Sequence, residues 1–224
     1  MKKYILYLVA AIFVNMIIFS CGKDNYDTPS ATLKGKVTYN GNPIGVRGSN
    51  NSVRLQLWQD GFPLKTAIDI YVTQDGSFSS SLFSGSYKLI TVQGNGPWQH
   101  KTDTISVNVS GNTDLEVPVT PYFSLENIQY QLNGNILTAS FKINQIDATK
   151  SIENVSLLVG KTKFVDLGYF IKREIAEGAT SGNINITMDI GTELQNNSNL
   201  FARVSVKADG ITEAIYDSNI FQVK

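Results

Sequence analysis

The stretch ATLKGKVTYNG, residues 31–41, decides the fold class of this chain. Its odd positions from 33 to 39 are Leu, Gly, Val and Tyr, whereas the even positions between them are Lys, Lys and Thr. A period of two belongs to a β-strand with one buried and one solvated face. The Asn40-Gly41 pair that follows suits a tight turn, because both residue types tolerate positive φ. The stretch therefore predicts a strand that ends in a turn.

Alternation of the same kind recurs along the chain, and no long segment shows a helical period. Before residue 121, alternating segments occupy residues 53–58, 68–72, 78–89, 105–109 and 115–119. After it, they occupy residues 129–143 around an Asn133-Gly134 turn, 155–159, 184–190 and 202–206. Short strands separated by turn residues indicate sandwiches of two sheets. We predict an all-β fold of two tandem β-sandwiches. Residues 164–179 stay unassigned, because a short helical turn and a loop both fit them.

Two prolines mark the boundary between the sandwiches. Pro118 and Pro121 lack the N–H that a central strand would donate to its neighbour, so they fit the end of an edge strand. We therefore place the first sandwich at residues 31–121 and the second at residues 122–224.

The beginning of the chain has the layout of an export signal. Two lysines at positions 2 and 3 precede a 16-residue apolar stretch, interrupted by one asparagine, which ends before Ser20 and Cys21. A spanning helix needs about 20 apolar residues, so a permanent membrane anchor is the weaker alternative. A lipid chain on the cysteine would explain both its position and the abrupt polarity after it.

The run Ile18-Phe19-Ser20-Cys21 resembles the bacterial lipobox, which implies cleavage before a lipid-modified cysteine. We expect a lipoprotein signal peptide at residues 1–20 and a membrane contact through acyl chains on Cys21. The polar residues 21–30 are predicted to form a tether.

The segments of the first sandwich resemble the transthyretin-like, or carboxypeptidase-regulatory-like, domain. That family has a G-x-V first strand, matched here by Gly35 and Val37, and a D-G-x-F…G-x-Y pair, matched by residues 75–78 and 85–87. LFARVSVKADG, residues 200–210, and the strand after it resemble the last two strands of immunoglobulin-like and fibronectin-type sandwiches. The resemblances imply a transthyretin-like sandwich followed by an immunoglobulin/fibronectin-like one, and they imply no activity.

The lipobox and the two sandwiches, in this order, resemble a two-domain lipoprotein family of Bacteroidetes that is found beside outer-membrane glycan-uptake systems. Lys23-Asp24 is similar to the charged residues that follow the cysteine in lipoproteins sent to the outer leaflet. The resemblance implies a lipid-anchored protein of the outer membrane that faces the cell surface. It also implies association with a TonB-dependent transporter and its substrate-binding lipoprotein.

The composition argues against several function classes. Lys and Arg number 19, and Asp and Glu also number 19, so the net charge of the chain gives no electrostatic footprint for nucleic acid or for an anionic membrane surface. It has one histidine, His100, one cysteine and no G-x-S-x-G motif, and therefore few groups for base or nucleophile catalysis. The carboxylates fall mostly at turns and on outward strand faces. We expect no enzyme, no cofactor and no metal site, with a carboxylate-dependent glycosidase as a minor alternative.

Aromatic residues are the candidates for ligand binding. Trp58 falls among polar residues on its strand, so it is either covered by another part of the chain or exposed as a platform for a sugar ring. Trp98, in the loop QGNGPWQHK, is either tucked back onto the sheet or presented to a ligand. Tyr71 is also either buried or exposed to a ligand, and we expect it to be buried. The polar neighbours predicted for such a site are Gln99, Asp69 and Gln56.

These features predict a non-catalytic accessory lipoprotein that binds a glycan or docks onto an uptake complex. The alternative is a structural spacer that contacts only protein partners. Exposed aromatic side chains in a row would favour binding, whereas two buried tryptophans would favour the spacer.

Overall fold

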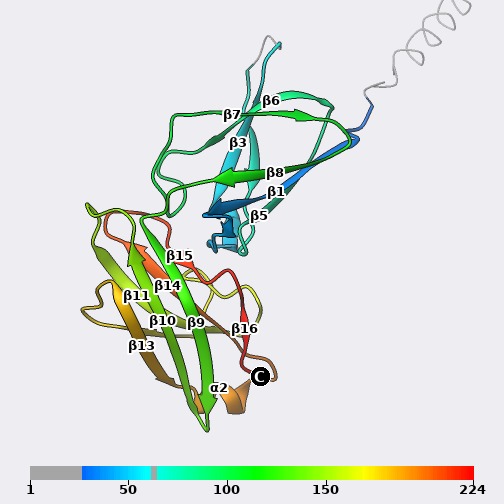
Figure 1. Ribbon diagram of the computed structural model, residues 1–224. Coiled ribbons are helices and arrows are strands. Elements are labelled where there is room, and N and C mark those ends of the chain that lie inside the picture. Colours follow the sequence, from blue (N-terminus) through cyan, green and yellow to red (C-terminus); the bar gives the residue numbers. More distant parts are fainter. Residues whose placement is uncertain (1–26, 62–64) are drawn as a thin grey trace, which may run out of the picture.

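The computed structural model describes residues 27–61 and 65–224, which form two domains that lie end to end (Figure 1). Within these residues, nearly all regular elements are strands, apart from a 3₁₀ turn at Ser49–Asn51 and one short helix, α2 (Gly191–Asn196). The all-β fold class that alternation predicts is thereby confirmed. Cys21 and the predicted signal peptide lie outside the described residues.

Two four-stranded sheets form the N-terminal domain. The first holds β2 (Asn42–Pro43), β1 (Ala31–Tyr39) and β5 (Ser77–Leu82), with β8 (Asn112–Pro118) paired to β1. The second holds, in spatial order, β4 (Ile68–Tyr71), β3 (Arg54–Gln59), β6 (Gly85–Thr91) and β7 (Ile105–Val109). Neighbouring strands are antiparallel except β1 and β8, which run parallel.

Strand β1 shows how alternation builds the core of this domain. Leu33 and Val37 are fully buried, and burying a side chain of this kind stabilises the fold by about 1.5–3 kcal/mol. Position 35 requires glycine, because a β-carbon there would collide with the backbone oxygen of Leu115 on β8 and with the ring of Phe78. Gly35 therefore allows β8 to run directly beside β1.

Two sheets also form the C-terminal domain. One holds β13 (Gly182–Asp189), β10 (Ile136–Gln145) and β9 (Phe123–Asn133), so that β9 is an edge strand. The other holds β12 (Lys172–Ile175), β11 (Ile152–Gly160), β14 (Phe201–Ala208) and β15 (Ile215–Tyr216), with β16 (Phe221–Gln222) also paired to β14. Alternate residues of β10, Leu137, Ala139, Phe141 and Ile143, are all buried and form its inner face.

The segment that the sequence leaves unassigned contains no helix. The structure forms a turn at Asp166–Tyr169, where the two residues bridge each other, and then strand β12. Asp166 of the turn accepts hydrogen bonds from Ser49 of the N-terminal domain.

Strand β14 departs from simple alternation, because it is buried on both faces. The side chain of Arg203 is wholly buried where the two domains meet. Its guanidinium donates hydrogen bonds to the backbone oxygens of Asp217 (2.7 Å), Val46 (3.0 Å) and Gln74 (2.5 Å). It also lies over the Tyr216 ring, 4.6 Å from the centroid. Two of the three accepting oxygens belong to the N-terminal domain, so this one side chain ties the domains together.

Burial lowers the pKa of Arg203 to about 10, which still leaves the side chain charged at neutral pH. A buried charge is tolerated only when its hydrogen-bonding capacity is used, as it is here. The backbone adds a second tie, since the Tyr216 N–H donates to the Gly45 oxygen at 3.0 Å. A β-carbon at Gly45 would collide with the Tyr216 oxygen, so this approach also requires glycine.

Candidate functional site

The outer face of the β4-β3-β6-β7 sheet carries four of the six predicted ligand-binding residues. Register pairs Arg54 with Tyr71 and Gln56 with Asp69, and it places Trp58 opposite Lys88 on β6. The Gln56 amide donates to the Asp69 carboxylate at 3.0 Å, and the Arg54 guanidinium lies 3.5 Å from the same carboxylate. The structure thus brings Trp58, Gln56, Asp69 and Tyr71 to one solvent-facing surface.

Trp58 is partly buried and lines a shallow hollow of about 460 Å³ on this face. Asp60, Lys88, Ser106 and Asn108 line the same hollow. Lys88 and Lys65 hydrogen-bond to the Asp60 carboxylate and hold its pKa below the ordinary value. The charged groups of this surface are therefore already engaged with one another.

Trp98 does not lie on any exposed surface. The structure shows the tucked-back alternative, because this side chain is only 4% exposed and belongs to the hydrophobic core. Backbone hydrogen bonds hold its loop against the segment that joins the domains, from Gln99 N–H to the Thr120 oxygen (2.9 Å) and from Tyr122 N–H to the Pro97 oxygen (3.2 Å). Trp98 is therefore removed from the predicted ligand-binding residues.

Gln99 is also removed from the predicted cluster. Its side-chain amide donates to the Asp147 carboxylate of the C-terminal domain at 2.9 Å. The predicted site therefore divides in two: Trp58 and its neighbours face solvent, whereas Trp98 and Gln99 belong to the contact between the domains.

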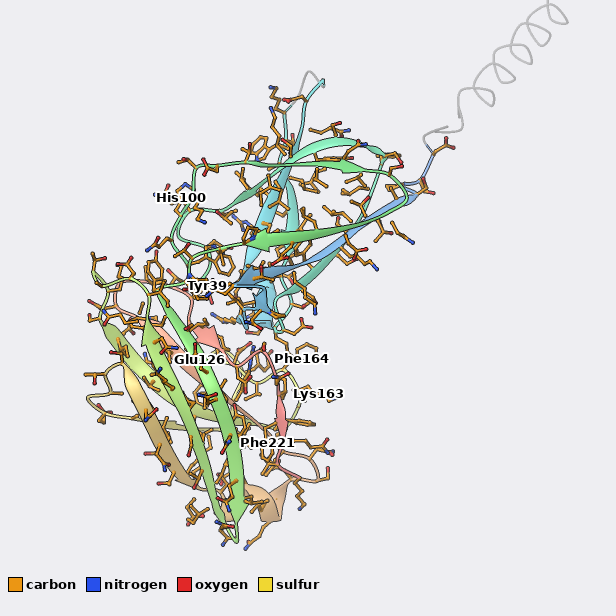
Figure 2. All side chains as sticks on the ribbon, in the orientation of Figure 1. Tyr39, His100, Glu126, Lys163, Phe164 and Phe221 are labelled. Carbon is orange, nitrogen blue, oxygen red and sulfur yellow. The ribbon has the colours of Figure 1, made fainter. Side chains whose placement is uncertain are left out.

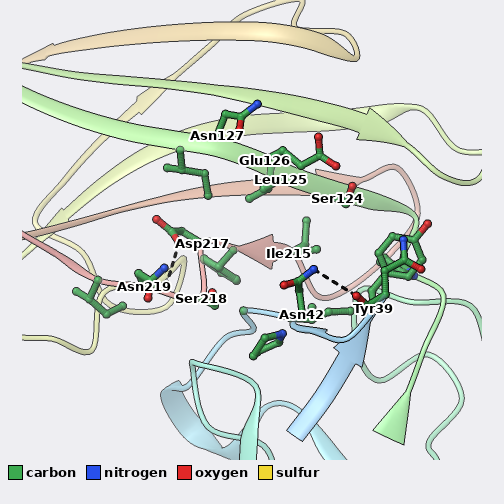
Figure 3. Close-up of a pocket in the computed structure, with 18 of the residues that line it drawn as sticks. Tyr39, Asn42, Ser124, Leu125, Glu126, Asn127, Ile215, Asp217, Ser218 and Asn219 are labelled. Atoms are coloured by element: carbon green, nitrogen blue, oxygen red, sulfur yellow. Dashed lines mark hydrogen bonds between the residues drawn. The ribbon is translucent and has the colours of Figure 1, made fainter. Parts of the chain in front are cut away.

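A groove of about 630 Å³ opens where the domains meet (Figure 3). Three segments that are far apart in the sequence line it: residues 39–45, 121–130 and 215–221. Its polar lining is dominated by asparagine and serine, at Asn40, Asn42, Ser124, Asn127, Ser218 and Asn219. Clefts between domains are common ligand sites, and this volume lies in their usual range of about 300–1,000 Å³.

Two of these asparagines have an unusual backbone conformation with positive φ. Asn40 has a φ of 49° in the turn after β1, and Asn127 has a φ of 54° in β9. Asn127 lies where the pairing of β9 with β10 shifts register between Ser140 and Lys142. Such a bulge bends the strand and redirects its side chains, and asparagine is one of the few residues other than glycine that tolerates this conformation. Among the described residues, neither of the two side chains makes a hydrogen bond to the protein.

The floor of the groove is rigid. The Tyr130 hydroxyl donates to the Asp217 carboxylate at 2.9 Å and accepts from the Val204 N–H at 3.1 Å. Its ring stacks on Phe221 with centroids 5.0 Å apart. Burial raises the pKa of Tyr130 well above its ordinary value, so the phenol stays neutral. Asp217 also accepts the Asn219 N–H at 2.9 Å, as Figure 3 shows.

The lining defines what the groove can do chemically. It contains no Lys, Arg or His, and its one exposed carboxylate is Glu126. Amides and hydroxyls both donate and accept hydrogen bonds, which suits a ligand rich in hydroxyl groups. Tyr39 adds a partly exposed aromatic ring at the edge. In the part of the chain that the structure describes, no group of three or more His, Cys, Asp or Glu residues could hold a metal ion.

Sequence reasoning did not find this groove. The Asn40-Gly41 pair is visible in the sequence as a turn, and nothing connects it to Asn127 or Asn219 along the chain. The only signal is a set of asparagines in three short segments, which gains meaning once the domains pack.

Within residues 27–61 and 65–224, we find no helix with the length and apolarity required to cross a bilayer.

Comparison with known proteins identifies the family. Residues 31–120 match the N-terminal domain of DUF3823, a protein of unknown function, and residues 123–220 match its C-terminal domain, DUF3823_C. No curated protein matches the chain.

Solved structures of the family agree with this match. A DUF3823 protein from Parabacteroides merdae is 40% identical, with a TM-score of 0.83 over 88% of this chain and 100% of that one. A second, from Bacteroides ovatus, is 38% identical, with a TM-score of 0.78 over 87% and 98%. A proposed carbohydrate-binding protein from Bacteroides uniformis shares the fold at 18% identity, with a TM-score of 0.72 over 88% and 99%. The chain described here belongs to the two-domain DUF3823 family.

Proposed function

We propose that this protein is a non-catalytic, glycan-binding accessory lipoprotein of an outer-membrane glycan-uptake system. The observation that carries the proposal is the groove between the domains, which is lined by asparagine and serine side chains and contains no cation. The protein would hold a glycan there beside a TonB-dependent transporter and its substrate-binding lipoprotein.

The hydrogen-bonding state of the groove supports a sugar ligand. The buried groups of the floor satisfy one another, as Tyr130 and Asp217 do. The side chains of Asn127 and Glu126, by contrast, are exposed and make no hydrogen bond within the described residues. Each sugar hydroxyl can donate and accept a hydrogen bond, and an amide side chain can form the matching bonds because it has both an acceptor oxygen and a donor NH₂ group. The Tyr39 ring offers apolar contact to a sugar face.

The outer face around Trp58 is the second contact surface in this proposal. Its indole is partly exposed on a polar sheet face, as a stacking platform would be, and Tyr71 is 43% exposed on the same face. Its polar groups are paired with one another, so we assign it the weaker share of binding. The carbohydrate-binding role proposed for the Bacteroides uniformis neighbour agrees with this function.

A glycan array tests the proposal. Residues 27–224 should bind at least one oligosaccharide on an array of neutral, acidic and amino-sugar glycans, without cleaving it. Asn127→Ala should weaken that binding about tenfold, which corresponds to about 1.4 kcal/mol. Asn183→Ala is the matched control, because Asn183 is an exposed asparagine on β13 that does not line the groove. Equal effects of the two variants would contradict the groove assignment.

Absence of binding to every glycan would favour the structural spacer. The hydrogen bonds of Arg203 to the N-terminal domain support the spacer alternative, because a spacer needs a fixed geometry between its domains. In the spacer case, cross-linking on whole cells should capture only protein partners.

The lipid anchor is tested separately. Cys21→Ala should abolish labelling by a fatty-acid analogue and should release the protein from the membrane fraction. Labelling that persists in this variant would contradict the assignment of Cys21.

A further inference from the structure

One loop of the C-terminal domain gathers exposed apolar side chains. Among the described residues, eight large hydrophobic side chains are exposed, and four of them lie in residues 164–171. The exposed fractions are 62% for Phe164, 60% for Tyr169, 43% for Phe170 and 38% for Ile171. We call residues 161–172 the aromatic loop. Clustered exposure of this kind marks an interaction surface, whereas single exposed hydrophobics are ordinary.

The exposure does not come from a loosely held backbone. At the centre of the aromatic loop, Val165 and Asp166 are completely buried. The Asp166 carboxylate accepts hydrogen bonds from the N–H groups of Gly168 (2.8 Å), Tyr169 (3.1 Å) and Ser49 (3.0 Å). Ser49 belongs to the N-terminal domain, so the loop is fixed to both domains while its apolar side chains point outward.

Hydrogen bonds also fix the two ends of the turn. The Leu167 N–H donates to the Tyr216 hydroxyl at 3.1 Å, and the Ile171 N–H donates to the Val159 oxygen at 2.8 Å. Backbone polar groups satisfied in this way can enter a less polar environment at little cost. The aromatic loop is therefore prepared for contact with an apolar phase.

Lysines accompany the apolar side chains. Lys161 and Lys163 are exposed, and Figure 2 shows Lys163 next to Phe164 at the edge of the C-terminal domain. Lys161 and Ile171 line the same shallow hollow of about 240 Å³. Lys172 is paired with Glu193 at 3.2 Å. The one carboxylate within the aromatic loop, Asp166, is buried, so the exposed charge of the loop is positive. The zero net charge of the whole chain, which predicts no affinity for an anionic surface, does not show this local excess.

This combination distinguishes a lipid surface from a protein partner. Cores of protein interfaces are enriched in aromatic residues and depleted of lysine. At a membrane surface, aromatic rings occupy the boundary between head groups and acyl chains, while neighbouring lysines contact anionic head groups. We propose that the aromatic loop docks onto an anionic lipid surface, with Phe164 and Tyr169 in the head-group region and Lys161 and Lys163 against the phosphates.

Vesicle sedimentation tests this proposal without the acyl anchor. Residues 27–224 contain every described strand of both domains and lack Cys21, so binding would come from the folded domains alone. They should sediment with phosphatidylcholine vesicles that contain about 30% phosphatidylglycerol, and much less with pure phosphatidylcholine. The double variant Phe164→Ser/Tyr169→Ser should bind about tenfold more weakly. Lys161→Gln/Lys163→Gln should remove most of the dependence on phosphatidylglycerol.

Phe83→Ser is the matched control, because Phe83 is 49% exposed in the turn between β5 and β6, far from the aromatic loop in the sequence. Its vesicle binding should equal that of the unaltered chain, and melting curves should show that all variants fold. Absence of sedimentation with anionic vesicles would overturn the proposal. Equal losses in Phe83→Ser and in the aromatic-loop variant would do so too. Capture of a protein partner through the aromatic loop, without vesicle binding, would contradict the proposal and show that the loop binds a protein instead of a lipid surface.

Discussion

The outer sheet face around Trp58 and the groove between the domains are both polar surfaces with aromatic residues, yet they are built differently. On the outer face, the Asp69 carboxylate accepts a hydrogen bond from Gln56 and forms an ion pair with Arg54. In the groove, Asn127 comes from a bulge, is exposed and has no hydrogen-bond partner within the described residues. A surface whose charged side chains are paired offers a ligand fewer open groups than one whose side chains have no partner.

The largest effect should come from Arg203→Ala, which removes the tie between the domains. Three backbone oxygens would lose a charged donor, and each buried acceptor left without a partner costs about 1–3 kcal/mol of unfolding free energy. Urea unfolding measures the loss. Glycan binding by the groove should disappear, whereas any binding by the outer sheet face around Trp58 should not change. Intact stability and binding in this variant would show that the groove does not depend on the junction.

The two tryptophans should respond in opposite ways to truncation. Trp98→Ala should lower the free energy of unfolding by about 3 kcal/mol or more, because the ring is buried in the core. Trp58→Ala should cost less than about 1.5 kcal/mol, because its ring is partly exposed. Thermal melting of both variants provides the measurement. A larger loss for Trp58 would contradict the structural distinction between them.

Binding measurements on Tyr39 and Trp58 rank the two surfaces. Tyr39→Ala should weaken glycan affinity by about 1–2 kcal/mol, and Trp58→Ala by less than about 1 kcal/mol, since the groove supplies more unpaired donors and acceptors. Isothermal titration with the glycan identified on the array decides the order. The reverse ranking would move the principal site to the outer face.

The smallest effect concerns pH, and it has opposite signs in two regions. Burial raises the pKa of Glu213 at the domain junction, so its contribution to stability is greatest below the pKa of the unfolded chain and falls as pH rises through the folded value. Glu213→Gln should therefore stabilise the protein at neutral pH and not at pH 3.

Hydrogen bonds from Lys88 and Lys65 lower the pKa of Asp60 on the outer face. Its contribution is present at neutral pH and is lost as pH falls through the folded value.

Unfolding curves of Glu213→Gln and Asp60→Asn at pH 3 and pH 7 test both signs. Asp60 is fully exposed to solvent, so screening keeps its effect small. Destabilisation by Glu213→Gln at neutral pH would show that its contact with Arg47, 4.0 Å away, outweighs burial.

The sequence by itself determined the all-β fold class and the faces of most strands, because side-chain direction in a strand follows a local period of two. It also indicated that Gln56 and Trp58 share one face of their strand and that Asp69 and Tyr71 share one face of theirs. The pairing of β3 with β4, which joins the two faces into one surface, comes from the structure. Local pattern could not reveal that Arg203, in the middle of an alternating strand, is buried on the face that meets the other domain.

Only the tertiary structure decided where Trp98 lies, which asparagines meet in the groove and which way the aromatic loop faces. Each of these depends on contacts between distant residues, such as Ser49 with Asp166 and Val46 with Arg203, which are separated by 117 and 157 positions. Alternation says which side of a strand is apolar, and it carries no information about which surface will cover that side. The packing of one domain on the other supplies that information, and it therefore placed Trp98 in the core and left Asn127 open to a ligand.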